Sequence, residues 1–326
     1  MTAIAGPQSS APSIGVVVIT YKARDQLRHC LPPLLASPLR PRVMVVNFSS
    51  GDGSVEEARR LGAEIQLVPR AEFNHGLTRE RARRALGTDI VVMLTPDAVA
   101  TDTEFVERLT RPIRDGLAAV SYGRQLARAG ASLVERYGRD FNYPNRSQLR
   151  SLADWWAYGS YTHFCSNACA AWSNAALDAV GGFPATLVSE ETVVVARLLR
   201  AGHRIAYVAH ATVVHSHDLD LLGELKRHFD IGYTRRRFAD LLREPERDEV
   251  RGRAFARGLL ARAWREEPAS VAAVAAHLAA KWLGYRLGLL GPALPLPLAS
   301  RLSGQDYFWR TAAARPALEP TLAAAG

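Results

Sequence analysis

Residues 14–20 read IGVVVIT, and this stretch decides the fold of the 326-residue chain. A short run of β-branched residues is typical of a strand that is buried on both faces of a sheet. Residues 23–36 follow with apolar side chains at helical spacing, although Pro32 and Pro33 interrupt them. Further along, apolar runs predict three more strands at Arg42–Val46, Glu64–Val68 and Ile90–Leu94, with helices between them at Val55–Leu61 and Thr78–Leu86.

This alternation of strand and helix predicts a parallel, doubly wound α/β sheet with right-handed crossovers. Ligands of such sheets bind outside the carboxyl ends of the strands. The loops at those ends carry polar residues in this sequence: Tyr21-Lys22, the turn from Asn47 to Asp52, Phe73 to Gly76, and Thr95-Pro96-Asp97. We therefore expect the functional site at this edge of the sheet.

The second half of the chain is less regular. Residues 121–172 mix aromatic and polar side chains in a way that favours a site wall over a simple core. Ser189 is placed to cap a helix that runs to Ala201, with Glu190 and Glu191 in its first turn. Short strands are expected at His203–Val208 and Thr212–Val214, and the region from about residue 222 is rich in arginine and helical in pattern.

Three acidic or histidine groups have residue types suited to catalysis or metal binding. Asp97 follows a buried strand and can hold a divalent cation that bridges a diphosphate, or it can cap a helix. His215 and His217 share one strand face, where they can bind metal or phosphate, or serve ordinary surface roles. Glu190 and Glu191 offer a general base, or simply the negative charge that favours a helix start.

Two polar groups also have alternative readings. The arginines of the third predicted helix, which include Arg79, can grip phosphates, but a helix divides them between two faces and solvent exposure explains at least half of them. Ser166 and Asn167 can bind sugar hydroxyls, or they can form a turn.

Composition limits the class of protein. Lys and Arg exceed Asp and Glu by nine, and this charge attracts polyanions in general. The arginine clusters lack interleaved aromatic residues, so we expect no nucleic acid partner. Three unpaired cysteines suit a reducing cytoplasm. Residues 1–13 lack the basic start and apolar run of a signal peptide and are expected to form a flexible tail.

The C-terminal region contains a long apolar stretch from Val271 to Leu298. His277, Lys281 and Arg286 interrupt it before it reaches the length of a spanning helix. Aromatic residues beside the charged ones are typical of helices that lie on a bilayer surface. The alternative is a helix pair that packs against the domain and closes it.

Eight segments in this order resemble the family 2 glycosyltransferases with the GT-A fold, in the rhamnosyltransferase-like branch. They span about Ile14 to Arg310 and read VVVITYKARDQL (16–27), FNHGLTRERAR (73–83), LTPDAVATD (94–102), YGRQLARAGASLVERYGRDFNYP (122–144), FCSNACAAW (164–172), GGFPATLVSEE (181–191), AGHRIAYVAHATVVHSH (201–217) and LSGQDYFW (302–309). The resemblance implies a Rossmann-like nucleotide-binding domain with a mixed sheet and a C-terminal helical extension. The implied boundaries are 14–220 for the GT-A domain, with a nucleotide half at 14–102 and an acceptor half at 103–220, and 221–326 for the extension.

Residue by residue, the resemblance also implies a site. It places the nucleotide and donor at Thr20, Tyr21, Asn47, Ser49, Asp52, Arg79 and Asp97, with Asn47 standing where the family usually has Asp. It places the sugar or acceptor at Arg124, Gln125, Ser166, Asn167 and Trp172. A divalent cation, Mg²⁺ or Mn²⁺, is implied at Asp97 with His215 or His217, and Glu191 is the implied base beside Glu190.

The implied activity is inverting transfer of a deoxyhexose, above all rhamnose, from a dTDP- or UDP-sugar to a glycan or lipid-linked acceptor. The implied location is the cytoplasm, at the inner face of the cell membrane. Four departures from the family pattern, at Asn47, Glu80, Pro96 and Glu191, keep a second reading open: a catalytically inactive subunit that binds sugar nucleotide or serves as a scaffold. A metal-dependent phosphohydrolase would require more acidic ligands than these loops offer.

Overall fold

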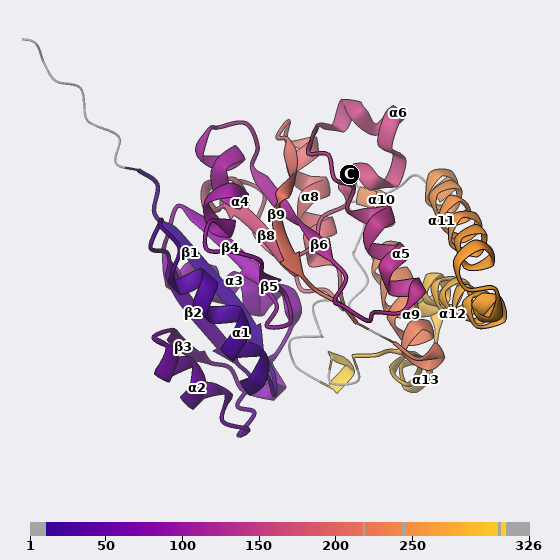
Figure 1. Ribbon diagram of the computed structural model, residues 1–326, viewed down its shortest axis with the longest axis horizontal. Coiled ribbons are helices and arrows are strands. Elements are labelled where there is room, and N and C mark those ends of the chain that lie inside the picture. The colour runs from indigo at the N-terminus through magenta and orange to yellow at the C-terminus, as the bar shows by residue number, and fades with distance from the viewer. Residues whose placement is uncertain (1–10, 218, 243–244, 306–307, 311–326) are drawn as a thin grey trace, which may run out of the picture.

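The computed structural model describes residues 11–217, 219–242, 245–305 and 308–310. One nine-stranded mixed sheet forms its centre, with helices on both faces (Figure 1). The strands are β1 (Ile14–Thr20), β2 (Arg42–Asn47), β3 (Glu64–Leu67), β4 (Ile90–Leu94), β5 (Val99–Ala100), β6 (Val120–Leu126), β7 (Gln148–Arg150), β8 (Cys169–Ser173) and β9 (Ile205–Val214). The helices are α1 (Arg24–Leu35), α2 (Ser54–Leu61), α3 (His75–Leu86), α4 (Phe105–Arg114), α5 (Leu133–Asn142), α6 (Trp155–Tyr158), α7 (Asn174–Ala179), α8 (Glu190–Arg200), α9 (Leu221–Arg237), α10 (Ala239–Leu242), α11 (Pro245–Glu266), α12 (Val271–Leu290) and α13 (Leu296–Leu302).

The first four predicted strands are confirmed. They lie in the order β3-β2-β1-β4, and all three pairings are parallel. The predicted helices between them also form, and α1 continues through Pro32 and Pro33. The IGVVVIT strand is buried along its whole length, as its composition predicts. The carboxyl ends of β1, β2 and β4 therefore meet at one edge of the sheet.

Alternation along β1 divides the core into two layers. Val17 and Ile19 face one layer, with side chains from α3, α7 and α8. Val16 and Val18 face the other, with side chains from α1, α2 and α4. Because each strand residue alternates between the two faces, a single β-branched run serves both cores.

The remainder of the sheet is mixed. β8 lies between β4 and β6 and is antiparallel to both, whereas β6 and β9 are parallel. The prediction of two short strands at 203–208 and 212–214 was wrong, since β9 is continuous. Its register with β6 shifts between Gly123 and Arg124, which pair with Val208 and Thr212. Gly123 is required at this bulge because a Cβ there would collide with the carbonyl oxygen of Ala211.

The C-terminal helices lie at the side of the molecule farthest from β1–β3, where α11 and α12 run next to each other (Figure 1). Gly284 of α12 lies against the backbone of Leu225 in α9, and Gly288 lies against that of Phe229. The two helices therefore run in the same direction at very close range. No described helix has the length and apolar character needed to cross a membrane.

Of the predicted N-terminal tail, residues 1–10 lie outside the described part of the chain. Ser13 is tied to the fold, because its backbone N–H and its hydroxyl both donate to Oδ2 of Asp89, at 2.8 and 2.7 Å. The boundary predicted at residues 220 and 221 falls between β9 and α9, and it stays a prediction.

Candidate active site

Asp97, His215 and His217 form a cluster at the carboxyl edge of the sheet. Their ligand atoms all lie within 4.8 Å of one another. Oδ2 of Asp97 is 3.4 Å from Nε2 of His215 and 3.1 Å from Nε2 of His217. Antiparallel pairing of β5 with the end of β9 brings the two segments together. Among the described residues, this is the arrangement with the strongest metal-binding character.

Gln125 fixes the orientation of His215. Oε1 of Gln125 is 2.8 Å from Nδ1 of His215, and it also accepts a hydrogen bond from Arg139. An amide oxygen only accepts, so Nδ1 of His215 carries a proton, and in the neutral imidazole the lone pair then lies on Nε2. That Nε2 is buried and has no hydrogen-bond partner among the described residues. A buried lone pair beside a carboxylate fits a cation.

The protonation states of the cluster also suit a cation. Burial acts to raise the pKa of Asp97, but the adjacent His215 and His217 outweigh burial and hold the pKa well below its usual value. Burial lowers the pKa of His217, against the opposing charge of Asp97. Near neutral pH the cluster therefore offers one carboxylate and a neutral imidazole at His217, which are the forms that bind metal.

Glu190 is the centre of a buried polar network. Its Oε1 lies 2.7 Å from Nη1 of Arg79 and accepts a hydrogen bond of 2.9 Å from the Asn167 amide. Oδ1 of Asn167 accepts in turn from the indole N–H of Trp172, at 3.0 Å. Burial acts to raise the pKa of Glu190, but the charges of Arg79 and His75 and the bond from Asn167 lower it overall. Glu190 is thus a paired, ionised carboxylate inside the protein.

Glu191 has the opposite character. Its side chain is only partly buried, and no hydrogen bond or ion pair to it is present among the described residues. Burial, followed by the charge of Glu190, raises the pKa of Glu191 to about 8. Ser189 immediately before the pair has a left-handed φ of 60° and makes no capping bond, so it occupies the predicted cap position without acting through its side chain. Strain of this kind is common at functional sites.

Ser166 and Asn167 connect the cluster to the glutamates. Ser166 Oγ accepts a 2.9 Å hydrogen bond from Nε2 of Gln125, which orients His215. Asn167 is the next residue and holds Glu190. The backbone N–H of Thr95 donates to the carbonyl oxygen of Ala168 at 3.4 Å, which ties the Asp97 loop to the same segment. One loop therefore contacts both halves of the candidate site.

The loop after β2 is ordered by its own side chains. Asn47 is fully buried, and its amide N–H₂ donates to Thr20 Oγ1 and Ser50 Oγ, both at 3.1 Å. Oδ1 of Asn47 accepts from the Ser50 backbone N–H at 3.0 Å. Asp52 accepts from the hydroxyls of Ser50 and Ser54. Asn47 and Thr20 thus shape the loop, and their side chains do not reach its surface.

Tyr21 is the exposed group at this end of the sheet. The Arg70 guanidinium donates to the Tyr21 hydroxyl at 3.0 Å and lies 5.1 Å from the ring centroid. Lys22 lies 5.6 Å from the same ring. Ser49 is exposed nearby in sequence, with a left-handed φ of 51°. An exposed aromatic ring flanked by two cations suits a planar ligand that carries phosphate.

A family model described as "Glycosyltransferase like family 2" matches residues 11–234. The chain belongs to the family 2 glycosyltransferases. The glycosyltransferase is 29% identical over 300 residues to the O-antigen chain rhamnosyltransferase RfbN of Salmonella typhimurium. It is 30% identical over 304 residues to the O-antigen chain rhamnosyltransferase WbaN of Salmonella anatum. Each alignment covers 91% of this chain and 96% of the relative.

Solved structures share the fold of the glycosyltransferase at low sequence identity. The mannosyltransferase PcManGT from Pyrobaculum calidifontis, solved with GDP-Man and Mn²⁺, matches with a TM-score of 0.54 and 15% identity over 95% of this chain and 84% of that one. TarS of S. aureus matches with a TM-score of 0.52 and 14% identity over 94% and 91%. The GT-A fold implied by the sequence resemblance is therefore confirmed.

Two residues predicted to contact ligand are buried in the glycosyltransferase, and their roles stay predictions. Trp172 was expected at the sugar, but it is fully buried and its N–H is used by Asn167. Arg79 was expected at the nucleotide, but it is buried against Glu190. Arg124 is half-buried and makes no hydrogen bond or ion pair with another described residue, so its predicted role stays open.

The structure also adds residues that the sequence reasoning missed. Glu135 and Arg139 of α5 form an ion pair of 2.7 Å. Glu135 also accepts a hydrogen bond of 3.2 Å from the backbone N–H of His217. Arg139 donates a hydrogen bond to Gln125. At the other end of the chain, Phe308 and Trp309 pack in a cluster with Leu187, three residues before Glu190. Apart from the ion pair of Glu135 with Arg139, which are four residues apart, these contacts leave no local pattern because the partners are well separated along the chain.

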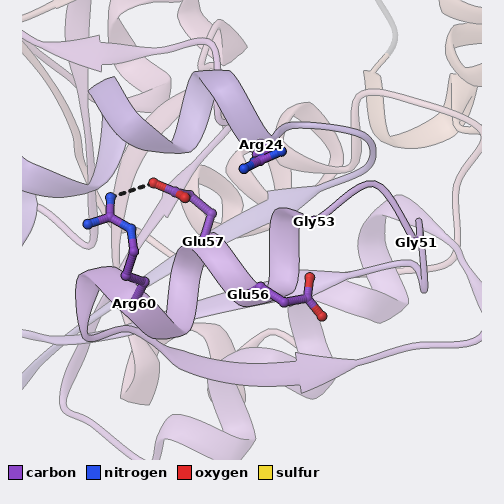
Figure 2. A pocket seen from close by; sticks show the side chains of 6 residues that line it. All are labelled: Arg24, Gly51, Gly53, Glu56, Glu57 and Arg60. Carbon is purple, nitrogen blue, oxygen red and sulfur yellow. Dashed lines mark hydrogen bonds and ion pairs between the residues drawn. The ribbon is translucent and has the colours of Figure 1, made fainter.

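A hollow of about 550 Å³ lies between the start of α1 and α2, and neither the cluster nor the glutamates line it (Figure 2). It is lined by Arg24, Gly51, Gly53, Glu56, Glu57 and Arg60. Glu57 is occupied there by an ion pair of 2.6 Å with Arg60. The hollow is shallow and open, and it borders the outer side of the β2 loop. We assign it no part in the reaction.

Proposed function

We propose that the glycosyltransferase moves a deoxyhexose, rhamnose, from a dTDP- or UDP-linked donor to a glycan or lipid-linked acceptor, with inversion at the anomeric carbon. The support for rhamnose comes from RfbN and WbaN, whose names state rhamnosyl transfer to the O-antigen chain and which align along nearly their whole length. A polysaccharide of the cell envelope is accordingly the proposed acceptor.

The residues of the cluster fit a divalent cation. Asp97, His215 and His217 would hold it, and the cation would stabilise negative charge on the departing diphosphate. Two nitrogen ligands and one carboxylate suit Mn²⁺ better than Mg²⁺, which prefers oxygen ligands and keeps several waters. Gln125 and Arg139 would keep the imidazole of His215 in its metal-binding tautomer.

Glu191 is the proposed general base. In a single displacement, the acceptor oxygen bonds to the anomeric carbon as the bond from that carbon to the diphosphate oxygen breaks. The acceptor proton passes to the Glu191 carboxylate. A raised pKa makes this carboxylate a stronger base than an exposed one. Glu190 acts beside it as a positioning residue, since its side chain is committed to Arg79 and Asn167.

One observation carries this proposal. Ser166 contacts Gln125, which orients His215 of the cluster, and the next residue, Asn167, contacts Glu190. A leaving-group site and a base must flank the reacting carbon within a few ångströms. The contacts of this one loop with Gln125 and with Glu190 support the proposal that both groups serve one site.

The alternative, an inactive subunit, loses part of its basis. Glu80 departs from the family pattern, but it accepts from the Phe183 backbone N–H at 3.0 Å and pairs with Arg83 at 2.6 Å. Asn47 also has a structural role in its loop. These two departures are explained by local bonding and do not indicate lost activity.

The test is a donor screen with and without Mn²⁺, using dTDP-rhamnose and a panel of UDP-, dTDP- and GDP-sugars. We expect Mn²⁺-dependent thermal stabilisation by one nucleotide, and donor turnover that Glu191→Gln abolishes while nucleotide binding persists. In Asp97→Asn, Mn²⁺ is expected to have no effect on the thermal stabilisation by the nucleotide. Binding without any transfer or donor hydrolysis by the wild type would favour the inactive subunit instead.

A further inference from the structure

The C-terminal helices expose an apolar surface that no described element covers. One side of α12 packs on α9 through its glycines, yet the opposite side is also apolar. Trp282 on that side is 65% exposed. Other exposed residues recur at three- and four-residue spacing, and all but Arg286 are uncharged: Ala272, Ala275, Ala279, Leu283, Arg286 and Leu290, with Ala273 also exposed.

The apolar surface continues past the end of α12. From Leu287 to Ser300 the chain contains no charged residue, and Arg286 and Arg301 bound this segment. Most of its side chains from Leu290 onward are exposed, including Leu296 and Leu298 in α13. We call the exposed side of α12 together with residues 290–298 the apolar face. A monomeric protein seldom leaves a contiguous surface of this kind without a use.

The neighbouring helix adds positive charge. On α11, Arg253, Arg257 and Arg265 are exposed on the same side as Trp264, which is 71% exposed. Between Val250 and Arg301 the chain contains eight arginines and lysines but only two acidic residues, Glu266 and Glu267. Glu267 is already paired with Arg136, and Glu266 with Arg262. Lys281, Arg286 and Arg262 are also paired, with Glu224, Glu249 and Asp140. The positive charge of this surface therefore comes from the exposed arginines of α11.

We propose that the apolar face docks on the surface of an anionic lipid bilayer, with the α11 arginines against the headgroups. Leucine and tryptophan enter the boundary between headgroups and acyl chains, while arginine remains at the phosphate level. A helix that is apolar on both sides, with one side already packed on protein, lies in such an interface.

The apolar face adjoins the candidate active site. Lys281, next to Trp282, forms an ion pair of 2.8 Å with Glu224 of α9. The helix α9 begins four residues after His217. A bilayer under α12 would lie near the start of α9 and so near His217, where a lipid-linked acceptor would arrive. This purpose rests on the proposed function, but the docking itself does not require a substrate.

The experiment is sedimentation of the full-length protein with sucrose-loaded vesicles, in phosphatidylcholine containing phosphatidylglycerol and in phosphatidylcholine alone. We expect the wild type to bind the anionic vesicles, and salt to weaken binding. Trp282→Asp combined with Leu290→Asp is expected to reduce the vesicle partition coefficient at least about tenfold. Trp156→Asp is the matched control, because Trp156 is 81% exposed on α6, remote from α12.

Each outcome separates docking from catalysis. Unchanged melting temperature and unchanged transfer to a water-soluble acceptor would show that the double variant is folded and active. A wild type that stays in the supernatant, or a double variant that binds as the wild type does, would overturn the proposal. A wild-type dimer in analytical ultracentrifugation that the double variant loses would assign the face to a second copy of the chain, and would also overturn it. Loss of transfer by Glu191→Gln has no bearing on vesicle binding.

Discussion

The pH dependence of transfer offers a direct test of Glu191. Only the ionised carboxylate accepts a proton, and burial together with Glu190 raises its pKa to about 8. With that pKa, about one tenth of the molecules carry an ionised Glu191 at about pH 7, and about nine tenths do at about pH 9. Because deprotonation activates the base, kcat/KM is expected to rise about tenfold across this interval and to level off above it.

The assay is release of nucleoside diphosphate at low donor concentration, with Mn²⁺ saturating at every pH. This regime reports kcat/KM, and so the ionisation of the free enzyme. Glu191→Gln is expected to remove both the activity and its rise with pH. The double variant Glu190→Gln, Arg79→Met replaces a buried ion pair by neutral groups of similar size. Removing the charge of Glu190 lowers the pKa of Glu191, and this effect exceeds the opposing one of removing Arg79, so the rise shifts to lower pH.

Two results would refute this reasoning. A kcat/KM that stays level from about pH 6 to 9 while chemistry limits the rate would mean that Glu191 does not titrate in this range. A rise that remains in Glu191→Gln would assign it to another group. A shift to higher pH in the double variant would contradict the stated effect of Glu190.

Three further predictions concern the support of the site. Gln125→Leu removes the acceptor for Nδ1 of His215 and is expected to weaken Mn²⁺ binding about 10- to 100-fold, measured by calorimetry. The control Gln125→Glu keeps an acceptor and is expected to lose less affinity. Wild-type affinity in the Leu variant would contradict the orienting role of Gln125. Arg79→Met leaves Glu190 buried without its cation and is expected to lower the free energy of unfolding, measured with urea, by about 3–5 kcal/mol. Adding Glu190→Gln is expected to restore most of this free energy. If the losses of the two single variants simply add, the ion pair does not account for them. Gly76→Ala drives a Cβ into the carbonyl oxygen of Pro184 and is expected to lower the free energy of unfolding by about 1–3 kcal/mol. It is also expected to lower transfer, because it displaces the loop before Glu190. The control Gly138→Ala has open space around the new Cβ and is expected to be neutral or stabilising in the same unfolding measurement.

Local patterns were sufficient for half of the sheet. The four parallel strands follow from short apolar runs with polar turns at their ends. β8 was not predicted as a strand, because CAAWS is short and its pairing partner β4 lies about eighty residues earlier. The bulge in β9 was likewise read as a break, since nothing in residues 209–211 indicates that the pairing resumes.

The candidate site shows the same limit. Asp97, His215 and His217 were named as ligands from the resemblance, and the structure brings their ligand atoms together. Gln125 was expected at the sugar, but its contact with His215 spans ninety residues and leaves no local pattern. The buried side chain of Trp172 follows from the position of β8 inside the sheet, which was unknown. Arg79 was open to a better prediction: a glutamate that becomes buried requires a cation, and the arginines of α3 were the nearest candidates by fold.

The glycine contacts between α9 and α12 have a mechanical consequence. Backbones that touch without intervening side chains leave no room for one helix to slide or tilt against the other, so the two behave as a single rod. That rod starts beside His217 and carries Trp282 on its outer flank. A protein resting on Trp282 would hold its catalytic opening at a constant height above the lipid, and the acceptor hydroxyl would have to be presented at that height.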